Sequence, residues 1–392
     1  MCTAQTSVRP PAVTGAATRA EDHLELNMDG VVMRFHCIWL RDNCGCPECR
    51  VAQSAERRMF TADIPRELRP VDAGFDAATR SLQITWQDGH RSRYGADWLT
   101  RHDYSCPRTV ESDTSRHLWN RHSATIPAFE HDDVVGSPEG QLAYLDAIHE
   151  FGAAVLHGTP CVSHEVERFS SAIGCHVRET AFERVHNVRH DATGYNVAHT
   201  AFELKPHTDL PSYHWPPSIQ LLHFLVNEAE GGASTLTDGW AILSALRAHD
   251  PVAFETLCRI PVTFQLFSAE EDTRATSPLV QLNSRGDVVG FRFSNQLALP
   301  IDAPFDDVSA FYDAYQKLGA MVDSGEYTQE FRTDSGDLLT VHSHRILHGR
   351  RAFDPTSGDR HLQDVYLEYD DLMARRRVLR GTHIPHGPEE GL

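Results

Sequence analysis

Two His-x-Asp triplets, His131-Asp132-Asp133 and His207-Thr208-Asp209, have residue types and a spacing that could bind a metal ion. In a chain with 24 histidines, about two such triplets arise by chance, so their surroundings must separate them. The first triplet lies in a wholly polar stretch. The second lies in a segment that can hold an extended backbone, in which residues i and i+2 point to the same face. We therefore expect His207 and Asp209 to reach one metal ion.

A third ligand is available in the segment after the apolar run 338–341, where His348 follows. Two histidines and an aspartate that leave coordination positions open form the facial triad of non-haem Fe(II) oxygenases. The open positions suit a bidentate 2-oxoacid and then dioxygen. Arg360, twelve residues after His348, is placed to pair the far carboxylate of such a 2-oxoacid.

A second metal site is indicated by Cys44, Cys46 and Cys49, which place three thiols within six residues. Such crowding suits a tetrahedral site that a fourth ligand closes and that stabilises the fold. The C-x-C-x-x-C spacing is not the common zinc-finger spacing, but the thiol ligands favour zinc.

The elements that must position these residues fall into two regions, as the length of 392 residues also suggests. From residue 24 the chain shows short strand-like runs, including 31–37 and 82–86. A polar stretch, 101–122, is typical of a linker. In the second region, apolar spacing predicts helices over 140–151, 164–173, 240–249 and 305–324, and strands over 153–156, 219–226, 262–267, 288–293 and 338–341. This pattern predicts an α+β chain with a small β-rich N-terminal module.

Composition restricts the partners and the compartment. There are 55 acidic and 36 basic side chains, which give a formal net charge of −19. Nucleic acid and anionic membrane surfaces both need a basic footprint, so we expect neither as a partner. No apolar run approaches the roughly 18 residues of a membrane-spanning helix. The odd, clustered set of nine cysteines and the lack of a secretory apolar stretch predict a cytoplasmic protein.

The ordered motifs resemble a known family. His207-Thr208-Asp209, Pro216-Pro217-x-x-Gln220, Gly231-Gly232, Leu347-His348-Gly349-Arg350-Arg351 and Asp359-Arg360-His361-Leu362 look like those of the Fe(II)/2-oxoglutarate dioxygenases of the taurine-dioxygenase-like superfamily, closest to its γ-butyrobetaine dioxygenase-like members. The resemblance spans about 31–379. It implies a tail (1–23), a zinc-binding N-terminal domain (24–115) and a catalytic double-stranded β-helix, or jelly-roll, with flanking helices (116–392). It also implies a homodimer.

Site residues follow from the same resemblance. It implies that His207, Asp209 and His348 bind iron, that Arg360 binds the C5 carboxylate of 2-oxoglutarate, and that Ser234 is a weaker candidate beside it. The segment 39–44 is typical of the family's N-terminal domain, in which three cysteines and a histidine bind zinc. The matching histidine here is His90.

The substrate pocket departs from the family pattern. The resemblance places the aromatic cage for a trimethylammonium group at Phe182, His186, His199 and Tyr366, and the carboxylate-binding positions at Asn196 and Asn295. Relatives that use γ-butyrobetaine have aromatic residues where this chain has His186 and His199, and an imidazole holds a cation less well. Three alternatives follow: two neutral histidines still line a cation pocket, the substrate has another head group, or a different aromatic (Tyr195, Tyr213 or Trp215) completes the cage.

The expected function is therefore Fe(II)/2-oxoglutarate-dependent hydroxylation of a small zwitterionic acid, with O2 as co-substrate and γ-butyrobetaine as the best named candidate. The same chemistry on another betaine, amino acid, phosphonate or natural-product intermediate is the alternative. Two alternatives from other classes are a zinc-bearing binding module without activity and a metal-dependent hydrolase. An intact triad together with Arg360 argues against both.

Overall fold

The computed structural model describes residues 15–19, 22–28, 30–105, 116–190, 199–268 and 270–381. These residues form two compact units, the first of which ends its described part at Ser105 and the second of which begins its described part at Arg116. Within the described residues, no helix has the length and apolarity needed to cross a membrane.

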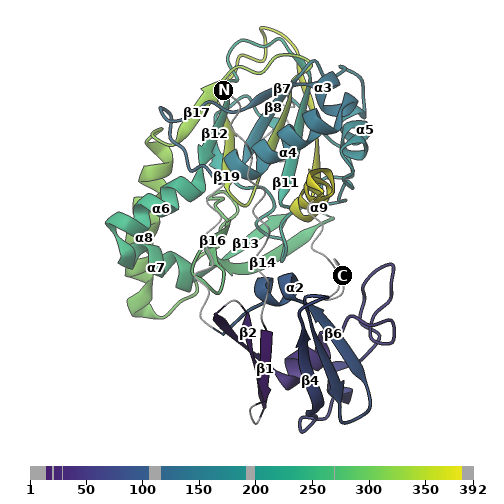
Figure 1. Ribbon diagram of the computed structural model, residues 1–392. Helices are drawn as coiled ribbons and strands as arrows, with labels where there is room; N and C mark the ends of the chain where they lie inside the picture. The colour runs from purple at the N-terminus through teal and green to yellow at the C-terminus, as the bar shows by residue number, and fades with distance from the viewer. Residues whose placement is uncertain are drawn as a thin grey trace, which may run out of the picture. The chain divides into compact units, whose positions relative to one another are not determined.

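The first unit is built from two small antiparallel sheets of three strands each (Figure 1). Leu26, Phe35, Leu82, Trp86 and Tyr94 lie in its core with almost no exposed surface. The strands are β1 (Gly15–Arg19), β2 (His23–Met28), β3 (Val31–His36), β4 (Pro70–Asp76), β5 (Ser81–Trp86) and β6 (Arg91–Gly95), and the helices are α1 (Cys37–Asp42), α2 (Ala96–Arg101) and a 3-10 turn, Thr61–Asp63.

The second unit is organised around a six-stranded and a four-stranded sheet. In spatial order the first contains β7 (Ala128–Glu130), β8 (Ala153–His157), β18 (Leu338–His342), β11 (Ile219–Asn227), β20 (Arg360–Leu367) and β9 (His186–Arg189), and the second contains β10 (Leu204–His207), β19 (Ile346–Arg350), β12 (Ser234–Asp238) and β17 (Thr328–Phe331). Phe224, Leu339 and Leu362 of the larger sheet pack with Leu236 and Ile346 of the smaller one in a single buried cluster. The two sheets therefore face each other across a common core.

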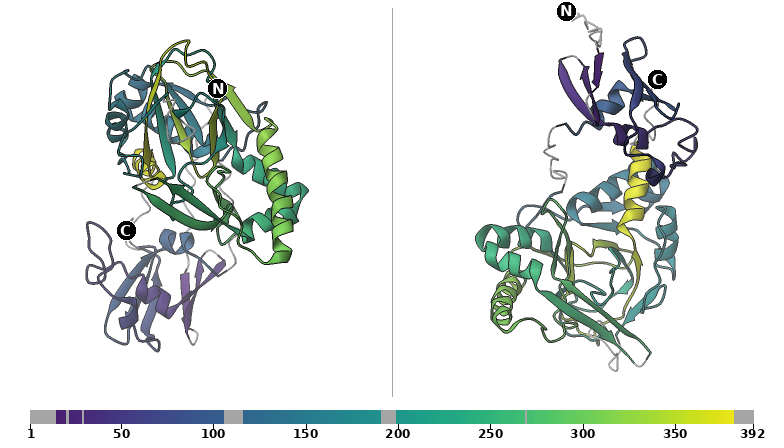
Figure 2. Two further views of the ribbon diagram at one scale, coloured as in Figure 1. Left: turned by 180° about the vertical axis from the view of Figure 1, so that it is seen from behind. Right: turned by 90° about the horizontal axis from the view of Figure 1, so that it is seen from below.

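Helices cover the second unit in two groups (Figures 1 and 2). Tyr144, Phe169 and Leu372 pack on the outer side of the six-stranded sheet, against Leu221 and Val365. The helices of this group are α3 (His131–Gly136), α4 (Pro138–Phe151), α5 (Glu165–Ala172) and α9 (Tyr369–Arg380); the other group contains α6 (Gly239–His249), α7 (Pro251–Arg259) and α8 (Phe305–Asp323), with the hairpins β13 (Pro261–Phe267)–β14 (Asp272–Pro278) and β15 (Val280–Leu282)–β16 (Val288–Phe291).

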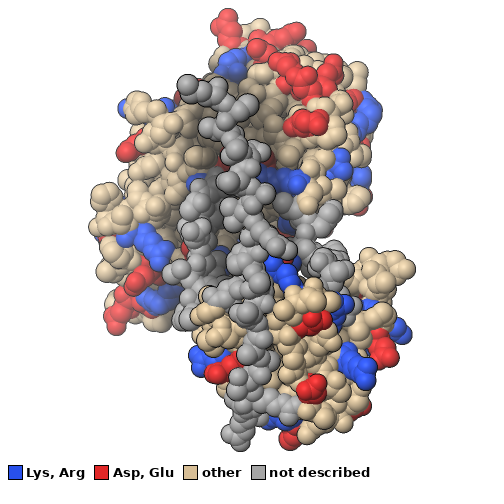
Figure 3. All heavy atoms as spheres, viewed as in Figure 1, with Lys and Arg blue, Asp and Glu red and all other residues tan. Residues whose placement is uncertain are grey.

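The acidic excess of the chain is visible on the face drawn in Figure 3, where Asp and Glu side chains gather around α3. Asp132 and Asp133 lie in the first turn of that helix and are exposed. Negative side chains there interact favourably with the positive end of the helix dipole. The cluster therefore needs no bound ion to explain it.

The structure confirms the mixed α and β composition and the four helices expected from apolar spacing, and it corrects three details. His131 is buried at the start of α3 instead of lying in a polar turn. The stretch 101–122 is not all linker, because Trp119 is buried and its backbone N–H donates to Asp238 at 3.1 Å. The apolar spacing did not predict helix α9, because this helix buries only Leu372 and Met373 and two residues are too few to show a helical period.

A fully buried ion pair ties several of these elements together. The guanidinium of Arg345 donates to the carboxylate of Asp238 at 2.8 Å, and the two side chains are 1% and 0% exposed. Arg345 also donates to the carbonyls of Glu150 and His117. Asp238 accepts from the backbone N–H groups of Trp119 and of the first turn of α6. Every polar group of the pair therefore has a partner.

We expect Arg345→Leu to lower the free energy of unfolding by about 3–5 kcal/mol, because it leaves the Asp238 carboxylate buried without its cation. Urea titration followed by circular dichroism measures the effect. Arg259→Leu is the matched control, since Arg259 pairs with Asp307 on the surface. A loss no larger than that of the control would show that the buried pair is not a structural requirement.

Candidate iron and 2-oxoglutarate site

The register of two neighbouring strands brings the distant histidines together. Strand β10 pairs antiparallel with β19, and His207 stands directly opposite His348. The centroids of the two imidazole rings lie 4.5 Å apart. Gly349 permits this approach, because a Cβ at that position would lie 2.6 Å from the carbonyl oxygen of Leu204. The backbone pairing therefore places two imidazoles side by side.

Asp209 reaches the same point from just beyond the end of β10. Thr208 holds the turn, because its N–H donates to the carbonyl of Phe293 at 2.7 Å and its hydroxyl accepts from the N–H of Phe293 at 3.0 Å. Leu210 then takes a left-handed backbone conformation, with φ at +49°. Ligand atoms of His207, Asp209 and His348 all lie within 4.8 Å of one another, so one ion could contact all three.

Hydrogen bonds fix which atoms face the shared point. The Nδ1 atom of His207 donates to the carbonyl of Lys205 at 2.9 Å, which leaves Nε2 free to bind a metal. On Asp209, Oδ2 accepts from the Gln220 amide and from the Tyr366 hydroxyl, each at 2.8 Å. Its Oδ1 lies 3.1 Å from Nε2 of His207 and 3.7 Å from Nε2 of His348. Oδ2 of Asp209 is thus fixed by two hydrogen bonds, while Oδ1 faces the two histidines.

The electrostatics of Asp209 and His348 suit a cation. Burial lowers the pKa of His348 to about 4, which keeps its imidazole neutral at pH 7. Burial alone would raise the pKa of Asp209, but the adjacent His348 and His207 outweigh it and hold this pKa far below its ordinary value. The group therefore presents a carboxylate and a neutral imidazole, the forms that bind metals.

The three residues open into a cavity of about 220 Å³ between the two sheets. Its walls include the apolar side chains of Leu222, Phe224, Leu339 and Leu362. The polar and charged lining residues are His186, His207, Asp209, Gln220, Ser234, Gln296, His348, Arg350, Arg360, Asp364 and Tyr366.

Arg360 supplies a guanidinium group to this cavity. Its Nε atom is buried and has no hydrogen-bond partner within the described part of the chain. The guanidinium lies between the rings of Phe224 and Phe353, at 5.7 Å and 5.6 Å from their centroids. Burial, with the nearby charge of Arg350, lowers the pKa of Arg360 to about 9. A partly buried cation whose Nε donor is unsatisfied among the described residues fits a ligand carboxylate, and Ser234 lines the same cavity.

The residues predicted to bind substrate are only partly assembled around the cavity. Phe182, His186 and Tyr366 line it. His199 is not in the lining, although its ring centroid lies 5.6 Å from that of His186. Asn295 is exposed and accepts a hydrogen bond from Tyr315 on α8, and its neighbour Gln296 lines the cavity instead. Asn196 and Tyr195 lie outside the described residues. Neither Tyr213 nor Trp215 is in the lining.

Sequence reasoning gave no role to four polar residues that line the cavity: Gln220, Gln296, Arg350 and Asp364. Gln220 donates both to Asp209 at 2.8 Å and to Asp364 at 2.9 Å, and Asp364 in turn contacts His186. Gln220 belongs to a motif that carries the family resemblance, and its position in that motif could have identified it as a candidate site residue. Asp364 had no such signal, because an acidic residue within an apolar strand is not by itself a motif.

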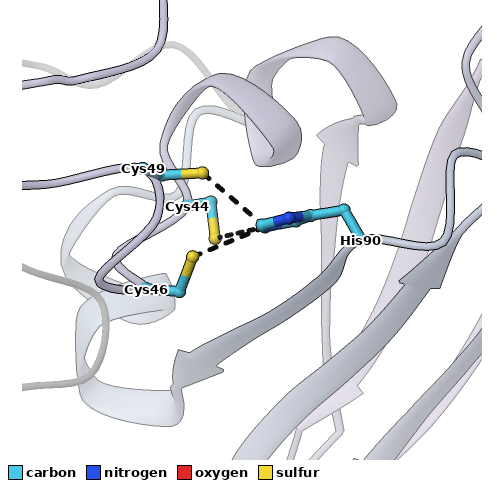
Figure 4. A group of neighbouring side chains, drawn as sticks. All are labelled: Cys44, Cys46, Cys49 and His90. Atoms are coloured by element: carbon cyan, nitrogen blue, oxygen red, sulfur yellow. Dashed lines mark hydrogen bonds between the residues drawn. The ribbon is translucent and has the colours of Figure 1, made fainter.

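The cysteine cluster in the first unit converges on His90, as Figure 4 shows. The thiols follow α1, and His90 lies in the turn between β5 and β6. Nε2 of His90 lies 3.3 Å from the sulfur of Cys44 and 3.6 Å from those of Cys46 and Cys49. Burial raises the pKa of the Cys44 thiol to about 12. Three thiols and an imidazole in this arrangement match the donor set of a closed structural metal site.

Two facing sheets, a carboxylate between two imidazoles and a buried arginine in one cavity define the class of iron- and 2-oxoglutarate-dependent dioxygenases. The model of the Taurine catabolism dioxygenase TauD, TfdA family matches residues 127–366, and that of the Gamma-butyrobetaine hydroxylase-like N-terminal domain matches residues 16–100. The chain belongs to the TauD, TfdA family. It is an enzyme that uses iron, 2-oxoglutarate and dioxygen, which excludes the rival reading as an inactive binding module.

Characterised relatives match over nearly the whole chain. Gamma-butyrobetaine dioxygenase of Pseudomonas sp. (strain AK-1) is 36% identical over 357 residues, covering 90% of this chain and 92% of the relative. The Homo sapiens protein of the same name is 28% identical and covers 88% and 91%. Mitochondrial trimethyllysine dioxygenase of Rattus norvegicus is 28% identical and covers 93% and 86%. Among solved structures, an asparagine oxygenase in complex with Fe(II) aligns over 64% of this chain and 84% of its own, at 18% identity and a TM-score of 0.49.

We expect Tyr366→Phe to weaken binding of Fe(II) by about tenfold, since partners that orient metal ligands typically contribute this much or more. Phe keeps the ring but removes the donor to Asp209. Anaerobic competition with a chromophoric chelator measures the affinity. Tyr312→Phe, at an exposed position of α8, is the control. If both variants bind Fe(II) as the native protein does, the Tyr366 hydroxyl does not position Asp209.

Proposed function

We propose that this enzyme hydroxylates an aliphatic carbon of a small zwitterionic acid, with His207, Asp209 and His348 binding Fe(II) and Arg360 binding the C5 carboxylate of 2-oxoglutarate beside Ser234. γ-Butyrobetaine is the best candidate substrate. The observation that carries the proposal is the convergence of three candidate metal-ligand side chains and the Arg360 guanidinium on one cavity, with the Arg360 Nε atom unpaired among the described residues.

The residues fit the iron. The three side chains offer two imidazole nitrogens and one carboxylate oxygen, a donor set typical of Fe(II) oxygenases. They come from one end of β10 and the middle of β19, so the ion would be contacted by protein from one side only. The other side is the cavity, which leaves coordination positions for 2-oxoglutarate and dioxygen.

The residues also fit 2-oxoglutarate. A carboxylate at Arg360 would satisfy the unpaired Nε atom and offset the mutual repulsion of Arg360 and Arg350. The apolar walls, among them Leu222 and Leu339, suit the methylene carbons between the two ends of the molecule. When bound, iron and 2-oxoglutarate activate dioxygen, and 2-oxoglutarate is converted to succinate and CO2.

The task of the protein is to hold the target carbon of the substrate beside the iron. Phe182, His186 and Tyr366 lie in the wall of the same cavity and are the candidates for that contact, with His199 next to them. Asn196 and Asn295 remain proposed carboxylate contacts, and Asn295 would have to exchange its bond with Tyr315 for one with the substrate. The relatives that support γ-butyrobetaine as substrate cover about nine tenths of the chain.

The proposal extends to the organisation of the chain. It assigns 1–23 to a tail, 24–115 to the N-terminal domain and 116–392 to the oxygenase domain, with the two facing sheets forming a double-stranded β-helix. It also includes a cytoplasmic homodimer. The buried cluster between the sheets and the family match over 127–366 support the assignment of the oxygenase domain.

We expect Asp209→Ala to abolish formation of succinate, because it removes the anionic ligand and leaves two imidazoles to hold the metal. Succinate released in the presence of Fe(II), 2-oxoglutarate and γ-butyrobetaine is the measurement. Asp133→Ala is the matched control, because Asp133 belongs to the other His-x-Asp triplet and is exposed on α3. If Asp209→Ala forms succinate at the native rate, the assignment of Asp209 to the iron-binding triad is wrong.

We further propose that Cys44, Cys46, Cys49 and His90 bind zinc in a structural role. All four positions of a tetrahedral ion would be filled by protein, which leaves none for substrate. Arg41 donates to the sulfur of Cys49 at 3.3 Å, a contact that stabilises a thiolate. The distances among the four side chains support this proposal.

We expect the purified protein to contain about one zinc per chain, and Cys46→Ser to lose it together with thermal stability of the first unit. Elemental analysis and differential scanning calorimetry are the measurements. Cys161→Ser is the control, because that thiol is exposed and remote from the cluster in sequence. Retention of native stability after complete zinc removal would contradict a structural role.

A further inference from the structure

The ring of Phe353 contacts the guanidinium groups of both arginines that line the cavity. The guanidinium carbon of Arg350 lies over this ring at 4.7 Å from its centroid, and that of Arg360 lies over it at 5.6 Å. The face of an aromatic ring carries partial negative charge, which attracts a cation. Phe353 is buried and is not part of the cavity lining, so it can act on a ligand only through these side chains.

Nearby charges repel the guanidinium of Arg360. Burial and the positive charges of Arg350 and Arg332 lower the pKa of Arg360 to about 9. Its Nε atom has no hydrogen-bond partner in the part of the chain that the structure describes. The rings of Phe224 and Phe353 attract this group, and of the two Phe224 also belongs to the apolar core between the sheets. Phe353 is therefore the clearer candidate for a residue whose contact with Arg360 has a role of its own.

The Gly231-Gly232 turn fixes where the Phe353 ring stands. Both glycines have positive φ angles, +83° and +65°. The N–H of Gly232 donates to the carbonyl of Ala352 at 2.9 Å, so the turn lies against the segment that carries Phe353. A Cβ on Gly231 would lie 2.7 Å from that carbonyl oxygen. A Cβ on Gly232 would lie 3.3 Å from Cβ of Phe353 and 3.9 Å from Nε of Arg360. The absence of side chains in the turn therefore permits the approach of the ring to the guanidinium.

We propose that Phe353 is a positioning residue for the co-substrate, because its ring holds the Arg360 guanidinium in place before 2-oxoglutarate binds. This inference rests on the proposed function, since it assumes that Arg360 binds the C5 carboxylate. A flexible side chain loses rotational freedom when it pairs with a ligand, and a side chain that is already ordered loses less. Phe353 therefore strengthens the binding of 2-oxoglutarate without touching it. Binding of Fe(II) by His207, Asp209 and His348 does not depend on this ring.

The test measures 2-oxoglutarate and Fe(II) affinity separately in Phe353→Leu. Anaerobic titration of the Fe(II) protein with 2-oxoglutarate, followed by the visible metal-to-ligand absorption, gives the first dissociation constant, and competition with a chromophoric chelator gives the second. We expect 2-oxoglutarate to bind about fivefold more weakly, the effect of ordering one flexible side chain, and Fe(II) affinity to stay unchanged. Phe129→Leu is the control, because the ring of Phe129 packs against that of Tyr144. Native 2-oxoglutarate affinity in Phe353→Leu, or an equal loss in the control or in Fe(II) affinity, overturns the assignment.

Replacement of Phe353 by pentafluorophenylalanine separates the charge of the ring face from its shape. Five fluorine atoms reverse the charge of the face and change the shape little, so the ring no longer attracts the Arg360 guanidinium. We expect this replacement to weaken 2-oxoglutarate binding at least as much as Phe353→Leu does, and native affinity overturns the assignment.

The variant Arg360→Met distinguishes the two proposals. If Arg360→Met binds 2-oxoglutarate as tightly as the native protein does, the proposed role of Arg360 is wrong and the positioning role of Phe353 is wrong with it. If Arg360→Met binds 2-oxoglutarate weakly while both Phe353 replacements bind it normally, only the role of Phe353 is wrong. Weak binding in all three supports both proposals.

Discussion

The pairing of β10 with β19 is the constraint on which the rest of the site depends. His207 and His348 are 141 positions apart in the chain (348 − 207), and only this antiparallel register sets them opposite each other. A slip of one residue would turn either imidazole to the other face of the sheet. Gly349 secures the close approach, because any side chain there would meet the carbonyl of Leu204. The metal ligands are thus held by backbone pairing, which makes the geometry insensitive to side-chain rotamers elsewhere.

A polar network behind the ligands connects the metal position to the substrate wall. Gln220 bridges Asp209 and Asp364, Tyr366 donates to Asp209, and Asp364 contacts His186. All of these side chains come from the six-stranded sheet or from β10 and the turn after it. Polar interactions therefore join the two sheets in addition to the apolar core between them. Gln220, Asp364 and Tyr366 are buried, and in a buried setting each hydrogen bond is stronger than in water and each unmatched polar atom is more costly. This is why the Nε atom of Arg360, which has no partner among the described residues, is informative.

The sequence alone predicted much of this arrangement, and its failures have physical causes. The His-x-Asp pair, His348, Arg360 and the three clustered cysteines could be found because their chemistry requires particular residue types at short or ordered spacings. His90, 41 positions after Cys49, was indicated only by the family resemblance. Asp364 and the outward position of Asn295 could not be found, since both depend on strand register and on packing against α8. Helix α9 and the burial of His131 were missed for a related reason: tertiary contacts, and not an apolar rhythm, place them.

The central claim is that one cavity holds Fe(II) through His207, Asp209 and His348 and 2-oxoglutarate through Arg360. Its most direct test is the anaerobic visible spectrum of the Fe(II) protein as 2-oxoglutarate is added. Our account predicts a new metal-to-ligand charge-transfer absorption that saturates with about one equivalent, because a 2-oxoacid chelates an open facial site. It predicts much weaker 2-oxoglutarate binding in Arg360→Met. No absorption in the native protein, or the same affinity in Arg360→Met, would contradict it.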